Sequence, residues 1–479
     1  MSLNGALNSA FSGLRANARA ATLVSTNIAN ATTEGYGRRV LNVSPEVVGS
    51  YGGVKINGVS RIVDPAIISD RRISDAATGE NDTRYNFSKS LETAFGVAGD
   101  PGSLQDMMTR FENALLTAST NPASKQRLDG VAFAADQLAT KLNSLSARVQ
   151  QERKDADSQI ALQVQRLNDA LAQVDALNVD VKKASVRGGD LSSLLDERQR
   201  VIDSISEIVP IRSVPRENGE VALFTTKGGT LLDGRPSEFG FTASNTMSPN
   251  ISLAAGSLSG LTVNGRPANL AFYDGGTLAA NFEIRDTLAP QSQAKLDGVA
   301  RDLIERLGPG GPDATLSLGD PGFFTDAGAA FDPINEEGIS SRISLNMALQ
   351  PSNGETWRIR DGINALTQGE VGNGQLILDL SAALERRNPP SSAALDTVSR
   401  TVAQQMTELT AGVSADRVRI ENQKAFLVTQ NMALKEIEFS KAVDTDQELQ
   451  ILLEIEQNYA ANARVMTAVD EMLQRLLNI

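Results

Sequence analysis

Few groups in this sequence could carry out covalent or metal chemistry. Cys and His are both absent, which removes thiolate and imidazole ligands, cysteine nucleophiles and any base of the Ser-His type. Carboxylates remain, and adjacent acids such as Asp196 and Glu197 are the residue type that glycoside hydrolysis uses. Such pairs also occur on any solvated helix face, and a sequence does not show the cleft that the reaction needs. We therefore predict no catalytic residue and no enzymatic activity.

Two loops resemble ligand-binding motifs only in part. Gly308–Gly311 is rich in glycine, but no Lys or helix follows it, so we interpret it as a turn and not as a phosphate-binding loop. Asp444 and Asp446 superficially suggest a calcium loop, but the Gly and the closing Glu at the required spacing are missing. Helix capping explains these two carboxylates better. The sequence predicts no metal site and no cofactor.

Composition and charge indicate a soluble protein of several domains. The 479 residues exceed what one hydrophobic core organises, which suggests about three units. Aromatic residues make up only 4%, so the cores must be filled by Leu, Val, Ile and Ala, as in helical bundles. The formal charge of -13 repels phosphate backbones and anionic lipids. No stretch approaches the roughly 20 apolar residues that span a bilayer. We expect no nucleic-acid or membrane partner.

The start of the chain does not look like a cleaved signal peptide. Residues 1–19 contain scattered Asn, Ser and Arg where a signal peptide carries an unbroken apolar segment. The absence of Cys suits a chain that crosses compartments without forming wrong disulfides. If the protein is exported, its route is not the ordinary cleaved one.

Apolar residues near the amino terminus alternate spacings of four and three, which is typical of a heptad seam. The seam predicts a helix over Leu3–Ile28, followed by a glycine loop at Gly35–Gly37 and by short strands and turns over 38–63. Its members are Leu3, Leu7, Ala10, Leu14, Ala21, Val24 and Ile28, with Asn17 as the one polar entry.

The middle of the chain alternates between two periods. Helical spacing returns over 103–121, 128–181 and 191–209, which predicts a long antiparallel helical layer. Between Ile211 and Phe282 the period changes to two, with hairpin signals such as Asn218-Gly219, so we predict an inserted β domain. A helix over 286–307 and a Gly/Pro-rich loop over 308–333 follow.

The carboxy-terminal part again has helical spacing. A heptad pattern begins at Leu395, and Thr445–Glu448 has the form of a capping box that opens the last helix. That helix has two apolar seams and therefore needs neighbours on two sides. Other subunits are the natural second neighbour, although periodicity alone fits equally well a monomer in which both terminal helices close a bundle. One seam contains Leu449, Leu452, Tyr459, Ala463, Met466, Leu473 and Leu477, and the other contains Ile455, Asn462, Val465, Val469, Met472, Leu476 and Ile479.

Both ends of the chain resemble one family. Ser25–Arg38, which reads STNIANATTEGYGR, is similar to the signature of the bacterial flagellar rod, hook and hook-associated proteins. Tyr459–Arg464, with 470–473 and 476–479, is similar to the other end of the same family. Three interior stretches resemble its hook-associated members more than its hook protein, namely 121–127, 194–209 and 228–234.

The resemblance implies a multidomain, mainly α fold with paired terminal coiled-coil helices, a long-helix middle domain and an inserted β-rich outer domain. The central region is short for this family, which leaves a second outer domain in doubt. The expected boundaries are 1–40 plus 442–479 for the terminal inner-tube domain, 41–210 plus 365–441 for the middle domain, and 211–364 for the outer domain.

The resemblance further implies a structural adaptor that joins the hook of the bacterial flagellum to its filament. Such a protein would be exported unfolded by the flagellar type III system, without cleavage, and would lie outside the cell. Its expected partners are further copies in a ring at the hook tip, hook protein on one side, a second junction protein on the other, and an export chaperone. Alternatives are another axial protein, such as hook or distal-rod protein, and a flagellum-borne enzyme or adhesin.

The two terminal segments hold the residues that we expect to mediate assembly. Asn27 and Asn30 lie beside an apolar seam, where polar groups set register, and Gly35 is suited to a positive φ after the helix. The expected amino-terminal interface comprises Leu3, Leu7, Leu14, Val24, Asn27, Ile28, Asn30, Gly35, Tyr36 and Arg38. The expected carboxy-terminal interface, shared by subunits and chaperone, comprises Leu449, Leu452, Ile455, Tyr459, Asn462, Met466, Val469, Leu473 and Leu476.

Overall fold

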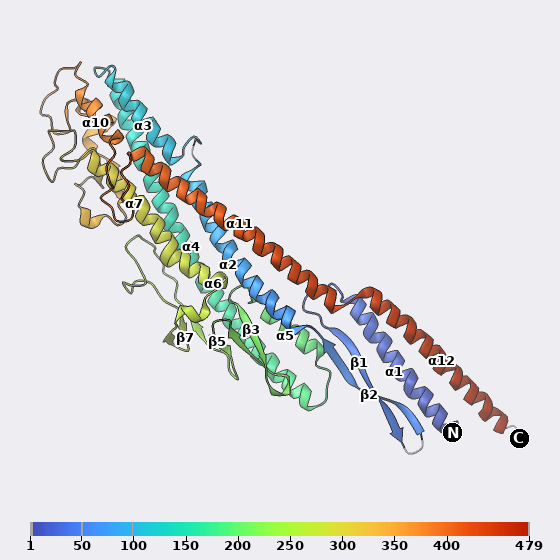
Figure 1. The fold of residues 1–479 in the computed structure, drawn as a ribbon. Helices are drawn as coiled ribbons and strands as arrows, with labels where there is room; N and C mark the ends of the chain where they lie inside the picture. Colours follow the sequence, from blue (N-terminus) through green and yellow to red (C-terminus); the bar gives the residue numbers. More distant parts are fainter. Residues whose placement is uncertain (1–2, 49–50, 98, 478–479) are drawn as a thin grey trace.

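The protein is an elongated array of long helices with small sheets along one side (Figure 1). The computed structural model describes residues 3–48, 51–97 and 99–477. Both ends of the chain lie at one end of the molecule, where α1 (Leu3–Ala29) and α12 (Thr445–Leu477) run antiparallel as a pair set apart from the other helices. The prediction of paired terminal helices is confirmed.

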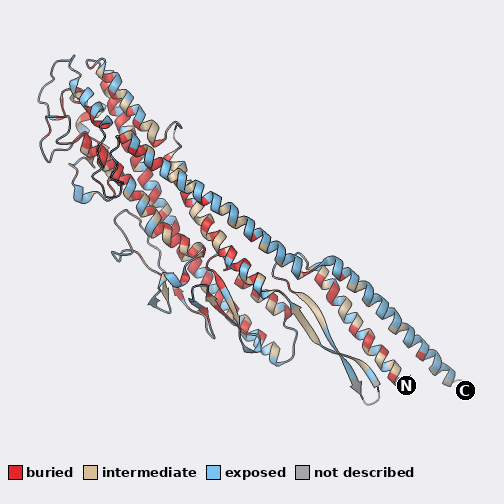
Figure 2. Ribbon diagram, viewed as in Figure 1, coloured by how far each residue is buried: buried red, intermediate tan, exposed pale blue. Residues whose placement is uncertain are grey.

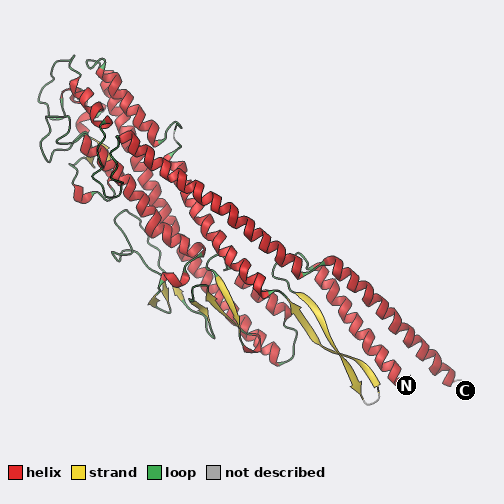
Figure 3. Ribbon diagram, in the orientation of Figure 1, coloured by secondary structure: helices red, strands yellow, loops and turns green. Residues whose placement is uncertain are grey.

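Long helices build the body of the molecule (Figure 3). The longest is α4, whose 62 residues run without interruption from Lys125 to Val186. At about 1.5 Å per residue it extends for about 93 Å. The other body helices are α2 (Pro65–Phe95), α3 (Leu104–Ser119), α5 (Ser192–Asp203), α6 (Gly276–Glu283), α7 (Ala289–Arg306), α8 (Ile339–Arg342), α9 (Arg358–Asp361), α10 (Gln375–Glu385) and α11 (Val402–Ala442).

Two hydrophobic cores lie one after the other along α4. The first is built around residues such as Phe111, Leu138 and Leu303, and it also takes in part of α2 and the start of α11. The second contains Leu167 and Val209 together with the strands that follow α5. Because α4 contributes to both cores, it is the element that joins them. In Figure 2 the buried residues concentrate on the body helices, and much of α11 and α12 is exposed.

Within the part of the chain that the structure describes, the strands form four small antiparallel sheets. β1 (Arg38–Val48) and β2 (Tyr51–Ile62) pair with each other, and β2 packs on α1. The sequence predicted short strands and turns here, but Gly52, Gly53 and Gly58 lie within the strand β2. The pairing shifts register between Asn42 and Val43, where Asn57 is the extra residue of a β-bulge. The remaining sheets are β3 (Ile211–Pro215), β4 (Val221–Thr225) and β5 (Thr230–Leu232); β6 (Phe239–Gly240), β7 (Thr262–Val263) and β8 (Arg266–Pro267); and β9 (Phe324–Asp326) with β10 (Ile343–Leu345).

The expected outer domain over 211–364 is divided between the two cores. Residues 211–282 pack in the second core, whereas residues 284–363 contribute to the first, beside α3 and α4. The helix expected over 286–307 begins earlier, because α6 starts at Gly276 and continues through a π-turn at Ile284–Leu288 into α7. We propose that the outer domain is shorter than expected and ends near residue 283.

The predicted start of the penultimate helix at Leu395 is wrong. Leu395 and Val398 have the expected spacing, but both precede α11, and Val398 is exposed. The helix begins after Thr401, whose hydroxyl accepts from the backbone N–H of Gln404 while the Gln404 side chain accepts from the backbone N–H of Thr401. This reciprocal cap fixes the boundary because it satisfies N–H groups that have no partner inside the helix.

A buried charged cluster fastens the π-turn to α4. The guanidinium of Arg285 is fully buried, donates to Asp157 Oδ1 at 2.8 Å and to the Ser259 carbonyl at 3.0 Å, and also pairs with Asp286. Burial alone would lower the pKa of Arg285, but the hydrogen bonds and charges of Asp286 and Asp157 raise it above its ordinary value. Asp157 also accepts from the backbone N–H of Ser244. The cluster thus holds the loop between β6 and β7 against the long helix.

Candidate functional site

The terminal helix α1 is covered on two sides. It packs against α12 on one side and against β1 and β2 on another. Gly13 faces α12 so closely that a Cβ placed there would lie 2.9 Å from Asn462 Nδ2. On the strand side, the Ser12 hydroxyl accepts from the backbone N–H of Val54 at 3.1 Å. Small residues on α1 therefore permit the close approach of α12.

The other terminal helix, α12, has far less cover. Val469 is buried, and most residues that share its face at spacings of three and four, among them Leu452 and Met466, are half-buried, whereas Tyr459 on the same face is exposed. Its remaining large apolar residues lie between 44% and 58% exposed, namely Leu449, Leu453, Tyr459, Val465 and Met472. Part of the surface of α12 thus has a neighbour in this chain, and five of its large apolar residues face solvent.

The predicted interface residues fall into three groups. Val24, Asn27, Tyr36 and Val469 are buried within the chain. Leu449 and Tyr459 are exposed, and the side chain of Leu476 lies outside the described part of the structure. The others are half-buried: Leu3, Leu7, Leu14, Ile28, Asn30, Gly35, Arg38, Leu452, Ile455, Asn462, Met466 and Leu473.

Glu448 joins the two ends of the chain. Its side chain is 1% exposed; Oε1 lies 2.6 Å from Arg38 Nε, and Oε2 accepts from Asn27 Nδ2 at 2.9 Å. The capping role predicted for Glu448 is wrong, because Asp444 accepts from the N–H groups of Asp446 and Gln447 and caps α12 instead. Glu448 is free to reach across to the amino-terminal segment.

Asn27 belongs to the same buried network. Its Oδ1 accepts from the Tyr36 hydroxyl at 2.8 Å and from the backbone N–H of Arg39 at 2.9 Å, and its Nδ2 also donates to the Arg39 carbonyl. The asparagine therefore fixes the loop and first strand to the end of α1. Burial raises the pKa of the Tyr36 hydroxyl, with Asp196 and Glu448 adding to the effect and Arg39 opposing it.

A second carboxylate ties the same loop to the body. Asp196 Oδ1 accepts from the backbone N–H of Gly37 at 2.9 Å and lies 2.6 Å from Arg61 Nε, while Oδ2 pairs with Arg39 at 3.0 Å. Asp196, which the sequence offered as half of a possible acid pair, is thus a structural anchor. Together Glu448 and Asp196 connect α12, the loop after α1, the strands and α5.

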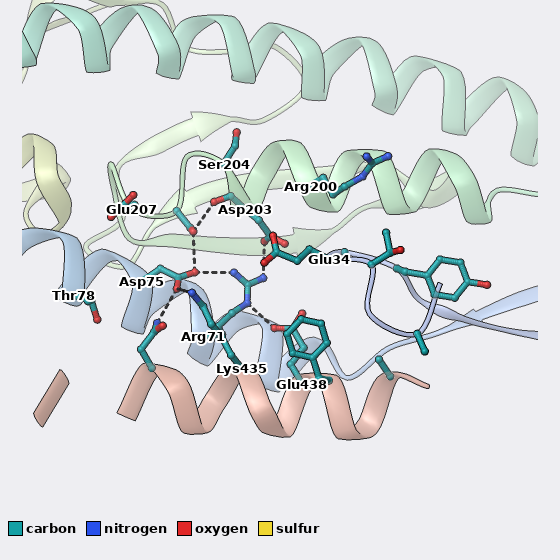
Figure 4. A pocket seen from close by; sticks show the side chains of 18 residues that line it. Glu34, Arg71, Asp75, Thr78, Arg200, Asp203, Ser204, Glu207, Lys435 and Glu438 are labelled. Atoms are coloured by element: carbon teal, nitrogen blue, oxygen red, sulfur yellow. Dashed lines mark hydrogen bonds and ion pairs between the residues drawn. The ribbon is translucent and has the colours of Figure 1, made fainter. Parts of the chain in front are cut away.

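A cleft of about 450 Å³ lies beside this joint, between residues 31–36, α2, α5 and α11 (Figure 4). Arg71 crosses it and reaches Glu438 at 2.6 Å, Asp75 at 2.7 Å and Asp203 at 2.8 Å. Burial would lower the pKa of Arg71, but the charges of Asp203, Glu438 and Asp75 raise it above its ordinary value. Because this cation is already fully paired, we interpret the cleft as a joint between elements.

The described residues offer neither a metal site nor a membrane span. Within residues 3–48, 51–97 and 99–477, no group of three or more acidic side chains could hold a metal ion. Among the helices of those ranges, none is both long and apolar enough to cross a membrane.

Gly35 offers a simple test of the loop geometry. It has a φ of 75°, and a Cβ there would lie 2.6 Å from Arg200 Cγ. We expect Gly35→Ala to lower the free energy of unfolding by about 1–2 kcal/mol, measured by urea denaturation, because left-handed backbone strains L-residues. Gly130→Ala is the control, since Gly130 is exposed in α4 with open space around it and should gain about 0.5–1 kcal/mol. Equal stability of Gly35→Ala and the native chain would contradict this account.

Comparisons with known proteins agree on one relationship. A family model described as the flagellar hook-associated protein FlgK helical domain matches residues 88–308, and one described as the flagellar basal body rod FlgEFG protein C-terminal matches residues 440–479. Flagellar hook-associated protein 1 of Bacillus subtilis is 22% identical over 514 aligned residues, which cover 98% of this chain and 97% of that protein. The chain is similar to flagellar hook-associated protein 1 along nearly its whole length.

Other relatives agree with the match. The Salmonella typhimurium hook-associated protein 1 is 26% identical over 242 residues, which cover 48% of this chain and 43% of that protein. A solved structure of the flagellar hook junction protein FlgK from Burkholderia pseudomallei superposes with a TM-score of 0.60 at 12% identity and covers 78% of this chain and all of that one. This last likeness concerns the fold. The expected resemblance to the hook-associated proteins is confirmed.

The two family models include the two anchoring carboxylates. Asp196 lies within the match to the hook-associated helical domain, and Glu448 lies within the match to the rod-protein carboxy terminus. Sequence reasoning missed the role of both. A usable signal existed for Glu448, which stands four residues before Leu452 and so places a charge on the partly covered face of α12.

Proposed function

We propose that this protein is a structural adaptor of the bacterial flagellum that joins the hook to the filament. The match to the hook-associated helical domain and the similarity to hook-associated protein 1 along nearly the whole chain support this role. The terminal helix pair would be the assembly unit and the body a rigid outer part.

The exposed large apolar residues of α12 are the observation that carries the proposal. Five large apolar side chains on one helix lie 44–58% exposed, although the same helix is long and continuous. An apolar surface of this kind in water marks an interaction site. Further copies of the chain, arranged in a ring, would supply the missing cover, because a repeated contact between unlike surfaces of identical subunits builds rings and tubes.

We infer partners on both sides of such a ring. Hook protein would lie on one side and a second hook-associated junction protein on the other. The same exposed apolar residues of α12 would be covered by an export chaperone before assembly, since an amphipathic helix is commonly bound through its apolar residues. Export through the flagellar type III system, without a cleaved signal, would then deliver the chain to the hook tip outside the cell.

An enzymatic role is not part of the proposal. In the cleft beside Tyr36, Arg71 pairs with Asp75, Asp203 and Glu438, and Asp196 has three partners of its own. A catalytic acid or base needs access to a substrate proton, which such pairing does not leave. We therefore infer a purely structural role.

Deletion of the gene should give cells with hooks but without filaments. The adaptor would be missing at the hook tip, so filament subunits would have no site on which to assemble and would be lost to the medium. Electron microscopy of flagella and assay of the filament protein in the culture fluid measure both effects. Loss of the hook itself would instead indicate a hook or rod component, and normal filaments would refute the adaptor role.

A further inference from the structure

The helix α11 leaves the hydrophobic cores well before it ends. Val402, Met406 and Leu409 are buried in the first core, and Val413 packs against it. From residue 414 to 442, all of which the structure describes, only Ile420 and Asn431 are buried, and no residue of this stretch belongs to either core. We call residues 414–442 the strap, because they run along α2 and connect the body to α12 (Figure 1).

Charged pairs hold the strap on α2. The two helices are antiparallel, and oppositely charged residues meet at five points along them. We call this set of contacts the charged seam. Its pairs are Glu92 with Arg417 at 2.8 Å, Asp82 with Lys424 at 3.0 Å, Asp75 with Lys435 at 3.8 Å, Arg71 with Glu438 at 2.6 Å, and Asp64 with Lys441 at 3.0 Å.

Apolar residues lie on both sides of the strap. On the covered side Ile420 is buried and Leu427 and Leu434 are half-buried, whereas Val418, Phe426, Met432, Ile437 and Phe439 are between 41% and 68% exposed. Apolar contact on the covered side is therefore limited, and the charged seam adds the contacts with α2 that salt can weaken.

Attachment of this kind depends on salt. Exposed ion pairs are weak individually, and the Debye length falls from about 10 Å at about 0.1 M salt to about 3 Å at about 1 M. Lys435 and Lys441 are more than half exposed and so are accessible to screening. Arg71, buried among three carboxylates, is the exception and marks the firmest point of the seam.

We propose that the strap is a salt-sensitive connection that detaches from α2 as one unit while both cores stay folded. When it is docked, α11 holds the terminal helix pair at a fixed distance from the first core. When it is detached, the pair is connected to the body through the loop after α1 and the Asp196 anchor. Any effect of detachment on assembly rests on the proposed function, whereas the detachment itself does not.

Hydrogen exchange of the full-length monomer, followed by mass spectrometry, tests the proposal. A helix without tertiary contacts is marginal in water, so the amides of a detached strap exchange quickly. We expect residues 414–442 to exchange about tenfold faster at about 1 M sodium chloride than at about 0.02 M, while α3 and the first half of α4 do not change. Exchange of the strap that is independent of salt, or an equal acceleration in α3, would overturn the proposal.

A charge-reversal variant tests whether the ion pairs of the charged seam, and not an effect of salt on the whole protein, control exchange of the strap. Lys424 lies 3.0 Å from Asp82 and 4.6 Å from the centre of the Tyr85 ring. Lys424→Glu should accelerate exchange of the strap about tenfold at low salt, and adding Asp82→Lys should restore most of the protection, because the pair is re-formed in reverse.

Lys125→Glu is the matched control. It makes the same change in net charge, but the partner of Lys125 is Asp129 on the same helix, so no contact between elements is lost. Exchange of the strap should stay as in the native chain. If Lys125→Glu released the strap as strongly as Lys424→Glu, or if the reversed pair restored no protection, the charged seam would not be what holds it. Because these measurements use the monomer, their outcome is independent of whether the protein joins hook to filament.

Discussion

Deletion of residues 449–479 will leave a folded monomer that no longer assembles. The helix α12 contributes no residue to either hydrophobic core, and its buried members in the described part of the chain are Glu448 and Val469. Removing it therefore costs the body little, yet removes the apolar surface that we assign to assembly. Thermal melting should show a body transition close to that of the full chain, and electron microscopy of cells that carry only the truncated form should show no filaments.

A single substitution should reproduce the loss. Leu453 is 58% exposed on α12, so Leu453→Asp should leave the unfolding transition of the monomer unchanged while placing a charge in the subunit contact. Gln457→Asp is the matched control, because it puts the same side chain at an exposed polar position on the same helix. Normal filaments with Leu453→Asp would show that this face of α12 stays uncovered in the assembled state.

Replacement of Arg285 by Met will destabilise the body by about 3–5 kcal/mol, because the change leaves the carboxylate of Asp157 buried without its cation. Urea denaturation followed by circular dichroism measures the loss. The backbone carbonyl of Ser259 also loses its donor, which adds to the cost.

The double variant Arg285→Met with Asp157→Leu is the informative control. A buried ion pair replaced on both sides by apolar groups is often near neutral, so the second change should recover most of the stability. Recovery should be incomplete because the backbone N–H of Ser244 loses its acceptor. If Arg285→Met alone unfolded no more easily than the native chain, the cluster would not fasten the π-turn.

The helices were predictable, since long apolar periodicity is a strong signal, but their ends were not. The sequence predicts capping both by Asp444 and by a box at Thr445–Glu448, and the structure bears out Asp444 alone. The heptad pattern places the start of the preceding helix at Leu395, although a real box at Thr401–Gln404 sets it. Both errors have one cause. A short motif is compatible with several local geometries, and tertiary packing selects among them.

The contacts that join the terminal segments to the body cannot be predicted from local sequence patterns. Glu448 meets Arg38 across 410 positions, and Asp196 meets Gly37 across 159. Asn27 was selected as a register-setting residue for assembly, but the structure satisfies its amide within the chain. The spacing identified residues with a special role and could not identify their partners, because the partners are brought together only by the fold.

Because α4 is continuous, it makes the body of the molecule resistant to bending along its length. Both hydrophobic cores are fixed to this one helix, and no proline or turn divides it between them. Bending the body would require successive backbone hydrogen bonds of α4 to stretch together, since sharp kinks arise where such a ladder is already interrupted. A torque applied at the terminal pair would therefore reach the far end of the molecule as rotation of a stiff rod.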